Sequence, residues 1–251
     1  MSSVRGGIRF IELDSLSLEC EGVDLGLLAY PTGSAERVSQ MLSELINDGV
    51  ALLAFHELPG RMVPFLVGKG VRGMVFLGQA GGKNVAVKIL REDAAVKTMK
   101  HEAENQLKAN RVDVGPKLLA WSTNVIVMEY VEGVNLGTVI QPGISENIAA
   151  VIDEVFEQTY RLDDIHLDHG QLVNASDHVI VSAFQKPVII DYSHASQTRK
   201  PRNVTAFASF LIRRINLQKS KDPYTIDLLK KYKLHRSRQH LEEIKHALKD
   251  P

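Results

Sequence analysis

The apolar residues of the N-terminal part follow first a strand-like pattern and then a helical one. The chain opens with GIRFIELDSLSLE, whose composition is typical of a strand. In SAERVSQMLSELINDG the apolar residues return every three or four positions, which predicts a helix capped by Ser34 and ended by Gly49. VALLAF then follows as a short strand or the end of a helix. Residues 1–60 are therefore expected to form a small α/β extension. The helix is expected to bury Val38, Met41, Leu42, Leu45 and Ile46.

The middle of the chain is expected to form a sheet with one helix. FLVGKGVRGMVFLGQ and KNVAVKIL indicate two strands joined by a turn at Gly81–Gly82. EDAAVKTMKHEAENQLKAN predicts a helix over residues 92–110, and Glu92 and Asp93 favour its N-terminus through the helix dipole. VGPKLLAW predicts a loop that leads into a strand, and the continuous apolar run in NVIVMEYV predicts a buried strand. The packed face of the helix is expected to hold Val96, Met99, Ala103 and Leu107.

Helices dominate the C-terminal part. SENIAAVIDEVFEQTYRLDDI predicts a long amphipathic helix whose apolar face runs through Ile148, Val151, Ile152 and Val155. HVIVSAF, a turn at Gln185–Pro187 and VIIDY predict a hairpin. Three more helices are expected around Val204–Leu217, Tyr224–Tyr232 and Arg238–Leu248. Because most strands precede most helices, the order favours a two-lobed α+β protein.

Composition and charge narrow the class of protein. The 251 residues contain one cysteine, Cys20, which excludes an internal disulfide and predicts a reducing compartment. The N-terminal segment lacks an apolar signal core and the apolar runs are too short to span a bilayer, so we expect a cytoplasmic protein without a membrane contact. Residues 199–251 hold 14 Lys and Arg against 5 Asp and Glu, whereas residues 1–198 hold 16 against 25. Such a basic region is typical of a contact with phosphates or acidic proteins, or of a solvated helical surface.

A glycine pattern marks the first candidate site. Gly68, Gly70 and Gly73, followed by Val75, form G-x-G-x-x-G-x-V between two expected strands. In dinucleotide-binding folds the same glycines lie between a strand and a helix. Between two strands the pattern is typical of the kinase loop that covers the ATP phosphates. The alternative is a glycine-rich hairpin without a ligand.

A lysine on the next expected strand favours the nucleotide site. Lys88 closes VAVK, and a lysine on this strand can pair with the α- and β-phosphates of ATP. Such a lysine needs a carboxylate to hold it, and the following helix offers Glu102 and Glu104. We prefer Glu102, because it lies beside Ala103 on the expected packed flank and belongs to the HEA triplet.

Together these motifs resemble the protein kinases, and most closely the small atypical kinases of the RIO type and of the tRNA-modifying KEOPS complex. The string DHGQL, followed by HVIV and PVIIDYSHAS, is similar to a group of predicted archaeal serine/threonine kinases. The resemblance covers residues 67–216 and implies a two-lobed protein-kinase-like α+β fold, with ATP and Mg²⁺ as its cofactors. We expect the α/β extension at 1–60, a kinase-like N-lobe at 61–132, and a reduced helical C-lobe at 133–251.

The resemblance also assigns adenine- and metal-binding positions. IVMEYVEG is similar to the linker between kinase lobes. This likeness implies that Met128 stands at the back of the adenine pocket and that backbone groups of Glu129 and Val131 meet the adenine edge. PVIIDYSHAS resembles the D-F-G segment, with Tyr-Ser in place of Phe-Gly, so Asp191 is the expected Mg²⁺ ligand. Magnesium prefers oxygen ligands and keeps several waters, so few protein ligands are needed.

The expected catalytic loop departs from the family pattern at one position. IHLDHGQLVNASDHVIV resembles the HGDLxxxN loop, and His169 matches it together with the following glycine and leucine. Gln171 stands where an aspartate would accept the proton of the attacking hydroxyl, and an amide cannot ionise. Asp168 is a candidate substitute, or else a structural partner of His169. As catalytic residues, Asp168 or His169 would assist at the acceptor hydroxyl. Asn174 and His178 both remain candidates for the second metal ligand.

The resemblance leaves two activities open. Lys88, Glu102 and Asp191 imply an ATP- and Mg²⁺-dependent Ser/Thr phosphotransferase that acts on itself or on a protein acceptor. Gln171 indicates the alternative, a nucleotide-binding pseudokinase or ATPase switch in a larger assembly, because general acid–base catalysis contributes about 10²–10⁴ in rate. No A-P-E motif follows Asp191, so the usual peptide-docking platform is not expected.

The basic region suggests a further partner. Arg199, Lys200 and Arg202 either lie near the phosphates or belong to a loop that caps a helix. The third hypothesis, compatible with either of the two activities above, is an RNA- or ribosome-associated factor that binds RNA through the C-terminal basic residues in a salt-dependent manner.

Overall fold

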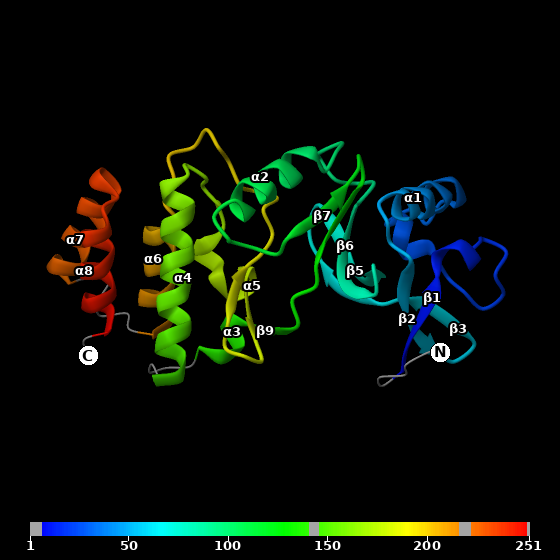
Figure 1. The fold of residues 1–251 in the computed structure, drawn as a ribbon, viewed down its shortest axis with the longest axis horizontal. Helices are drawn as coiled ribbons and strands as arrows, with labels where there is room; N and C mark the ends of the chain where they lie inside the picture. Colours follow the sequence, from blue (N-terminus) through cyan, green and yellow to red (C-terminus); the bar gives the residue numbers. More distant parts are fainter. Residues whose placement is uncertain (1–6, 141–145, 216–221, 250–251) are drawn as a thin grey trace. The chain divides into compact units, whose positions relative to one another are not determined.

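The computed structural model describes residues 7–140, 146–215 and 222–249, and they form two compact units (Figure 1). The first unit holds the chain up to Ala103 together with residues 117–130, and the second holds residues 104–116 and 131–251. Most strands precede most helices among the described residues, as the sequence predicts, and the α+β class is confirmed. The three-part division at residues 60 and 132 stays a proposal. Among the described residues, no helix combines the length and apolar character that crossing a membrane requires.

The first unit is built on one antiparallel sheet of eight strands. Its main order is β1-β2-β5-β6-β8-β7, with β3 paired to β2 and β4 paired to β5. Strand β2 joins the expected extension directly to β5, through the register of Leu52 with Gln79. The extension and the glycine hairpin therefore share one sheet. The strands are β1 (Ile8–Glu12), β2 (Leu52–Leu58), β3 (Arg61–Pro64), β4 (Leu66–Lys69), β5 (Gly73–Ala80), β6 (Lys83–Leu90), β7 (Leu118–Trp121) and β8 (Val125–Glu129).

Helix α1 (Ala35–Asn47) covers part of this sheet, after two short 3₁₀ turns, η1 (Leu13–Ser15) and η2 (Gly26–Ala29). The Ser34 side chain accepts a hydrogen bond from the Arg37 backbone N–H, as the capping pattern predicts. Four of the five predicted core residues are buried against the strands, but Ile46 is 41% exposed. Ile46 follows Leu45 by one position, which turns it about 100° away from the buried stripe.

The helix predicted over residues 92–110 is shorter than expected. Helix α2 begins at Lys100 and ends at Asn110, so Glu92 and Asp93 do not lie at its N-terminus. Asp93 instead accepts two hydrogen bonds from the Arg91 guanidinium, which competes with helix formation in that stretch. Leu107 was expected on the packed face and is 42% exposed, whereas Met99 and Ala103 are buried in a small cluster with Leu90 and Ile126.

The second unit combines helices with a three-stranded sheet of order β11-β10-β9. Its core lies between the long helix α4, whose predicted apolar face is confirmed, and the C-terminal helices. The end of the predicted helix at Leu217 lies outside the described residues. The elements are β9 (Gly133–Asn135), α3 (Leu136–Val139), α4 (Glu146–Asp164), η3 (Leu172–Asn174), α5 (Ala175–His178), β10 (Val179–Ser182), β11 (Pro187–Ile189), α6 (Asn203–Ile215), α7 (Pro223–His235) and α8 (Arg238–Lys249).

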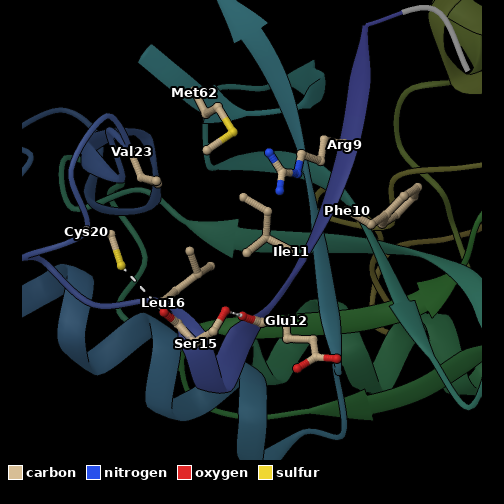
Figure 2. A pocket seen from close by; sticks show the side chains of 9 residues that line it. All are labelled: Arg9, Phe10, Ile11, Glu12, Ser15, Leu16, Cys20, Val23 and Met62. Atoms are coloured by element: carbon tan, nitrogen blue, oxygen red, sulfur yellow. Dashed lines mark hydrogen bonds between the residues drawn. The ribbon is translucent and has the colours of Figure 1, made fainter. Parts of the chain in front are cut away.

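A surface cavity of about 360 Å³ lies beside β1 in the extension (Figure 2). Nine side chains line it, among them Cys20, whose thiol donates to the Ser15 carbonyl oxygen at 3.4 Å. The lining includes none of the predicted site residues. The candidate chemistry therefore has to be sought elsewhere in the molecule.

Candidate functional site

The glycine pattern forms the hairpin of β4 and β5, and it leaves space for the predicted lysine. The Gly70 N–H donates to the Gly73 carbonyl oxygen at 2.8 Å and closes the tip, while Gly68 pairs with Val75. A Cβ atom on Gly73 would lie only 3.1 Å from Cγ and Cε of Lys88. Glycine at position 73 therefore lets the strand pass directly over the lysine stem.

Lys88 and Glu102 form a buried ion pair. Lys88 Nζ lies 2.5 Å from Glu102 Oε1, and the two side chains are only 6% and 7% exposed. Of the two glutamates on this helix, Glu102 is the one that meets the lysine, and Glu104 is exposed. The Lys88 ammonium is a donor group, which is the chemistry that recognises an anionic ligand such as a phosphate. Burying both charges costs free energy, and a position with only a structural role does not need a buried ion pair.

The residues expected near adenine lie at the end of β8 and just after it. Met128 is partly buried and packs against the cluster that holds Leu90 and Met99. Glu129 is exposed, and its backbone N–H donates to the Lys117 carbonyl oxygen at 2.9 Å. Val131 is partly buried and belongs to the second unit.

In the second unit, Asp168 is fixed by surrounding groups. Its carboxylate accepts a hydrogen bond from Arg199 Nε at 2.8 Å and a longer one, 3.4 Å, from the Arg202 backbone N–H. Its backbone N–H donates a hydrogen bond to the Ser196 carbonyl oxygen, and its carbonyl oxygen accepts one from the Ser196 N–H. The Asp168 side chain is 2% exposed, so Arg199 is its ion-pair partner and the group is poorly placed to meet a solvent-borne acceptor.

His169 is completely buried and is held at two points. Its backbone N–H donates to Asn203 Oδ1 at 2.8 Å, and its Nε2 lies 3.0 Å from the Ile190 carbonyl oxygen. Burial lowers the pKa of His169 to about 4, so the ring is neutral at pH 7. A neutral ring facing a carbonyl carries its proton on Nε2, which leaves Nδ1 as a buried acceptor without a hydrogen-bond partner among the described residues.

The sequence did not predict a polar network that is joined to His169 through Asn203. The Asp163 carboxylate accepts hydrogen bonds from Asn203 Nδ2 at 2.8 Å and from the Tyr232 hydroxyl at 3.0 Å, and burial raises its pKa. Asn203 Nδ2 also donates to the Leu167 carbonyl oxygen. The sequence did contain one indication of this network, because Asp163 is a charged residue on the apolar face of the predicted amphipathic helix. The network fastens the loop around His169 to helices α4, α6 and α7.

The candidate metal-binding segment offers oxygen atoms. Asp191 has a left-handed backbone, with φ of 65°, and accepts a hydrogen bond from the Ser193 N–H. Gln171 Oε1 is buried with no hydrogen-bond partner in the described part of the chain, and Asn174 is exposed. His178 is partly buried, and its ring lies 5.8 Å from that of His169.

These donors fit a hard cation that is bound by few protein ligands. Among the described residues, no three or more His, Cys, Asp or Glu side chains gather as a metal site. A carboxylate and amide oxygens suit Mg²⁺, which commonly relies on one or two protein ligands plus substrate phosphates. The imidazole of His178 suits it less well than the oxygen of Asn174.

Two glycines make room for residues around this segment. Gly115 has φ of 82°, and a Cβ there would lie 2.6 Å from the Tyr192 hydroxyl. Tyr192 is fully buried, which raises its pKa. Gly170 has φ of 86°, and a Cβ there would lie 2.5 Å from Arg199 Nη2. The same Cβ would lie 2.7 Å from the His194 backbone carbonyl oxygen, which cannot move aside as the Arg199 side chain can, and this contact and the left-handed backbone explain why position 170 needs glycine.

The comparison with known families identifies the chain. The family model of the RIO domain matches residues 83–216, which is more than half of the sequence. A search of curated proteins gave no match. The matched stretch contains Lys88, Glu102, His169 and Asp191, but it begins after the glycine hairpin and after residues 1–60. The chain therefore belongs to the RIO-domain family, an atypical protein-kinase-like and ATP-binding family.

Proposed function

We propose that this protein is an ATP- and Mg²⁺-dependent phosphotransferase of the atypical Ser/Thr protein kinase type. The buried pair of Lys88 and Glu102 beneath Gly73 is the observation that carries this proposal. Glu102 orients the lysine, and the lysine holds the α- and β-phosphates under the glycine hairpin. Because phosphoryl transfer depends mostly on positioning and charge neutralisation, such a pair contributes directly to the rate.

The remaining roles follow the chemistry of the side chains. Asp191 holds Mg²⁺, with Asn174 as the preferred second ligand. The metal supplies positive charge against the phosphoryl oxygens. Met128, together with backbone groups of Glu129 and Val131, binds adenine. The network of Asp163, Asn203 and Tyr232 keeps the loop around His169 in place.

Gln171 takes the position next to the acceptor hydroxyl. Its buried Oε1 has no partner among the described residues and can accept a hydrogen bond from that hydroxyl, which orients the nucleophile. It cannot remove the proton, and Asp168 is occupied by Arg199. We therefore expect transfer that is slower by about 10²–10⁴ than with an aspartate at position 171. The acceptor is a serine or threonine of this chain or of a partner protein.

The second candidate is a nucleotide-binding pseudokinase or ATPase switch. The same two features favour it: the amide at position 171 and the ion pair that occupies Asp168. This candidate predicts ATP binding without transfer to any protein.

Incubation with γ-labelled ATP and Mg²⁺ distinguishes the two candidates. We compare the wild type with Asp191→Asn, which tolerates the left-handed backbone, and with Asp177→Asn, a matched change at an exposed aspartate of α5. Label on Ser or Thr that is lost only in Asp191→Asn supports the phosphotransferase. ATP binding without label, together with label gained in Gln171→Asp, supports the pseudokinase. Failure of the wild type to bind ATP would contradict both.

We also propose a cytoplasmic location and an RNA or ribosome-associated partner. Lys230, Lys231 and Lys233 are exposed on α7, which favours contact with phosphates. Neutralisation of Lys230, Lys231 and Arg236 should weaken RNA binding and reduce its dependence on salt in a titration. Equal binding by wild type and variant would contradict the proposed RNA contact.

A further inference from the structure

The extension contributes an aromatic residue to the neighbourhood of the glycine hairpin. Tyr30 lies outside the stretch that matches the RIO domain, and the sequence assigned it no role. Its ring meets two cations of the hairpin region: Lys69 Nζ lies 3.9 Å from the ring centroid, and the guanidinium carbon of Arg91 lies 4.8 Å from it. Both distances are within the range of a cation–π interaction. The Lys69 ammonium also lowers the pKa of the Tyr30 hydroxyl.

The two cations are attached to the two sides of the hairpin tip. Lys69 is the last residue of β4 and lies between Gly68 and Gly70 in the chain. Arg91 follows β6, and its Nη1 donates to the Gly70 carbonyl oxygen at 2.9 Å. The Arg91 backbone N–H also donates to the Arg72 carbonyl oxygen at 3.0 Å. The Tyr30 ring therefore connects both flanks of the glycine tip.

Tyr30 can act as a fixed point because the extension around it is tied to the sheet. Its carbonyl oxygen accepts a hydrogen bond from the Glu92 N–H at 3.0 Å, and the Thr32 hydroxyl donates to the Glu92 carboxylate. The next helix is also anchored: Arg37 donates to the Leu90 carbonyl oxygen at 3.3 Å. A further anchor joins Glu44 of α1 to the β7–β8 turn, where it accepts hydrogen bonds from Ser122 and Asn124.

We propose that Tyr30 is a positioning residue of the nucleotide site, which holds Lys69 and Arg91 and so fixes the glycine hairpin over Lys88. The inference rests on the proposed ATP binding, because it assigns the hairpin its ligand. A hairpin that is already ordered presents its backbone N–H groups to the phosphates without an ordering cost at the time of binding. The extension is thereby part of the nucleotide-binding machinery.

The test combines hydrogen exchange of the free protein with nucleotide affinity, measured on the full chain. Tyr30→Leu removes the aromatic face, and Lys69→Met removes one cation from an exposed position, where substitutions are rarely severely destabilising. Tyr30→Phe keeps the ring and serves as the conservative rescue. Lys83→Met, at an exposed position on the opposite end of the β5–β6 hairpin, is the matched control. The probe is a fluorescent ATP analogue with Mg²⁺.

We expect Tyr30→Leu and Lys69→Met to speed amide exchange at residues 68–73 and to raise the Kd of the analogue, each by about two- to tenfold. Tyr30→Phe should restore most of both properties, and Lys83→Met should change neither. Unchanged exchange, or faster exchange with an unchanged Kd, would overturn the positioning role while the proposed ATP binding stands. Absence of binding in the wild type would overturn the proposed ATP binding itself, and the positioning role with it.

Discussion

Glu102 and Asp168 are both buried carboxylates paired with a basic residue, and the difference between them lies in the cation. In the first unit, Lys88 is as buried as its partner, since the two side chains are 6% and 7% exposed. In the second unit, Asp168 is 2% exposed, but the Arg199 side chain is 49% exposed. The first pair withdraws a positive charge from water, whereas the second leaves the charge at the surface and uses the arginine as a bridge.

The difference indicates two functions for similar chemistry. A lysine without much water around it interacts strongly with any anion that reaches it. Arg199 instead donates hydrogen bonds to other groups of the protein, from Nε to the Asp168 carboxylate and from Nη2 to the His194 carbonyl oxygen at 2.6 Å. We infer that the first pair prepares a ligand contact and that the second pair holds a loop in shape.

The largest expected effect comes from breaking the buried pair. Lys88→Met leaves the Glu102 charge buried without its cation, and we expect a loss of about 3–5 kcal/mol in the free energy of unfolding of the first unit. Trp121 is the only tryptophan and lies in that unit, so its fluorescence during urea unfolding measures the change. Nucleotide binding should be lost as well.

The double variant Lys88→Met/Glu102→Leu sharpens this result. It replaces both charges with apolar groups and should recover most of the stability, without recovering nucleotide binding. Lys83→Met is the control for the loss of one lysine and should stay within about 0.5 kcal/mol of the wild type. If Lys88→Met alone is as stable as the wild type, the ion pair of Lys88 and Glu102 is not shielded from water.

The second expected effect is a loss of stability in acid that comes from His169 in the second unit. The pKa of His169 is about 4 in the fold, against about 6.5 in an unfolded chain. The unfolded state therefore binds more protons between these values, and stability falls as pH drops from about 6.5 to about 4. From pH 7 to pH 5 this residue alone should cost about 2 kcal/mol.

Hydrogen exchange of the amides of α4 and α6 at pH 7 and pH 5 measures this loss, after correction for the intrinsic exchange rates. His169→Gln cannot titrate, so its loss of protection should be smaller than that of the wild type by about the same 2 kcal/mol. An identical loss in the two proteins would show that His169 is not the group responsible.

Much of the fold followed from local patterns in the sequence. The capped helix α1 and the long helix α4 each carry an uninterrupted period and clear end signals, so they were predicted correctly. The turn between β5 and β6 was also predicted correctly, but the strand expected over residues 65–79 is split at the glycines into β4 and β5. Residues 92–99 were predicted wrongly as helix, because the side-chain pairing of Arg91 with Asp93 overrode a helical composition. Exposure at the edge of a helical face, as at Leu107, depends on neighbours that the period does not reveal.

Within the candidate site, too, some residue pairs could be predicted from the sequence and others could not. Lys88 and Glu102 are 14 residues apart on consecutive elements, so their pairing could be inferred from order and apolar context. Asp168 and Arg199 are 31 residues apart, and Asp163 and Tyr232 are 69 apart. No local pattern encodes such distant pairs. The sequence therefore could not decide whether Arg199 contacts a phosphate or belongs to a loop that caps a helix. The RIO-domain match confirms the family, while the individual roles stay predictions.

A smaller effect distinguishes the bridge from a simple ion pair. Arg199→Lys keeps the positive charge but cannot reach both Asp168 and the His194 carbonyl oxygen with one ammonium. We expect a loss of about 1 kcal/mol in the stability of the second unit, seen as faster exchange near residues 168–171. Arg213→Lys, at an exposed arginine that donates one hydrogen bond from Nη2, is the control and should change little. Equal effects of the two variants would contradict the bridging role.

The smallest expected effect tests whether the lysine of the first pair is positioned for a ligand. A methyl group at Gly73 would lie 3.1 Å from the Lys88 stem and 3.0 Å from the Ile89 carbonyl oxygen, so Gly73→Ala should displace the lysine slightly. Gly78→Ala is matched, because it crowds the same strand to the same degree, at 3.0 Å from the Leu52 carbonyl oxygen, without touching Lys88. We expect a roughly two- to fivefold rise in the Kd of an ATP analogue for Gly73→Ala only, which corresponds to less than about 1 kcal/mol. Since both variants strain the sheet alike, a rise in both would assign the effect to the sheet, whereas a rise in Gly73→Ala alone would assign it to the lysine.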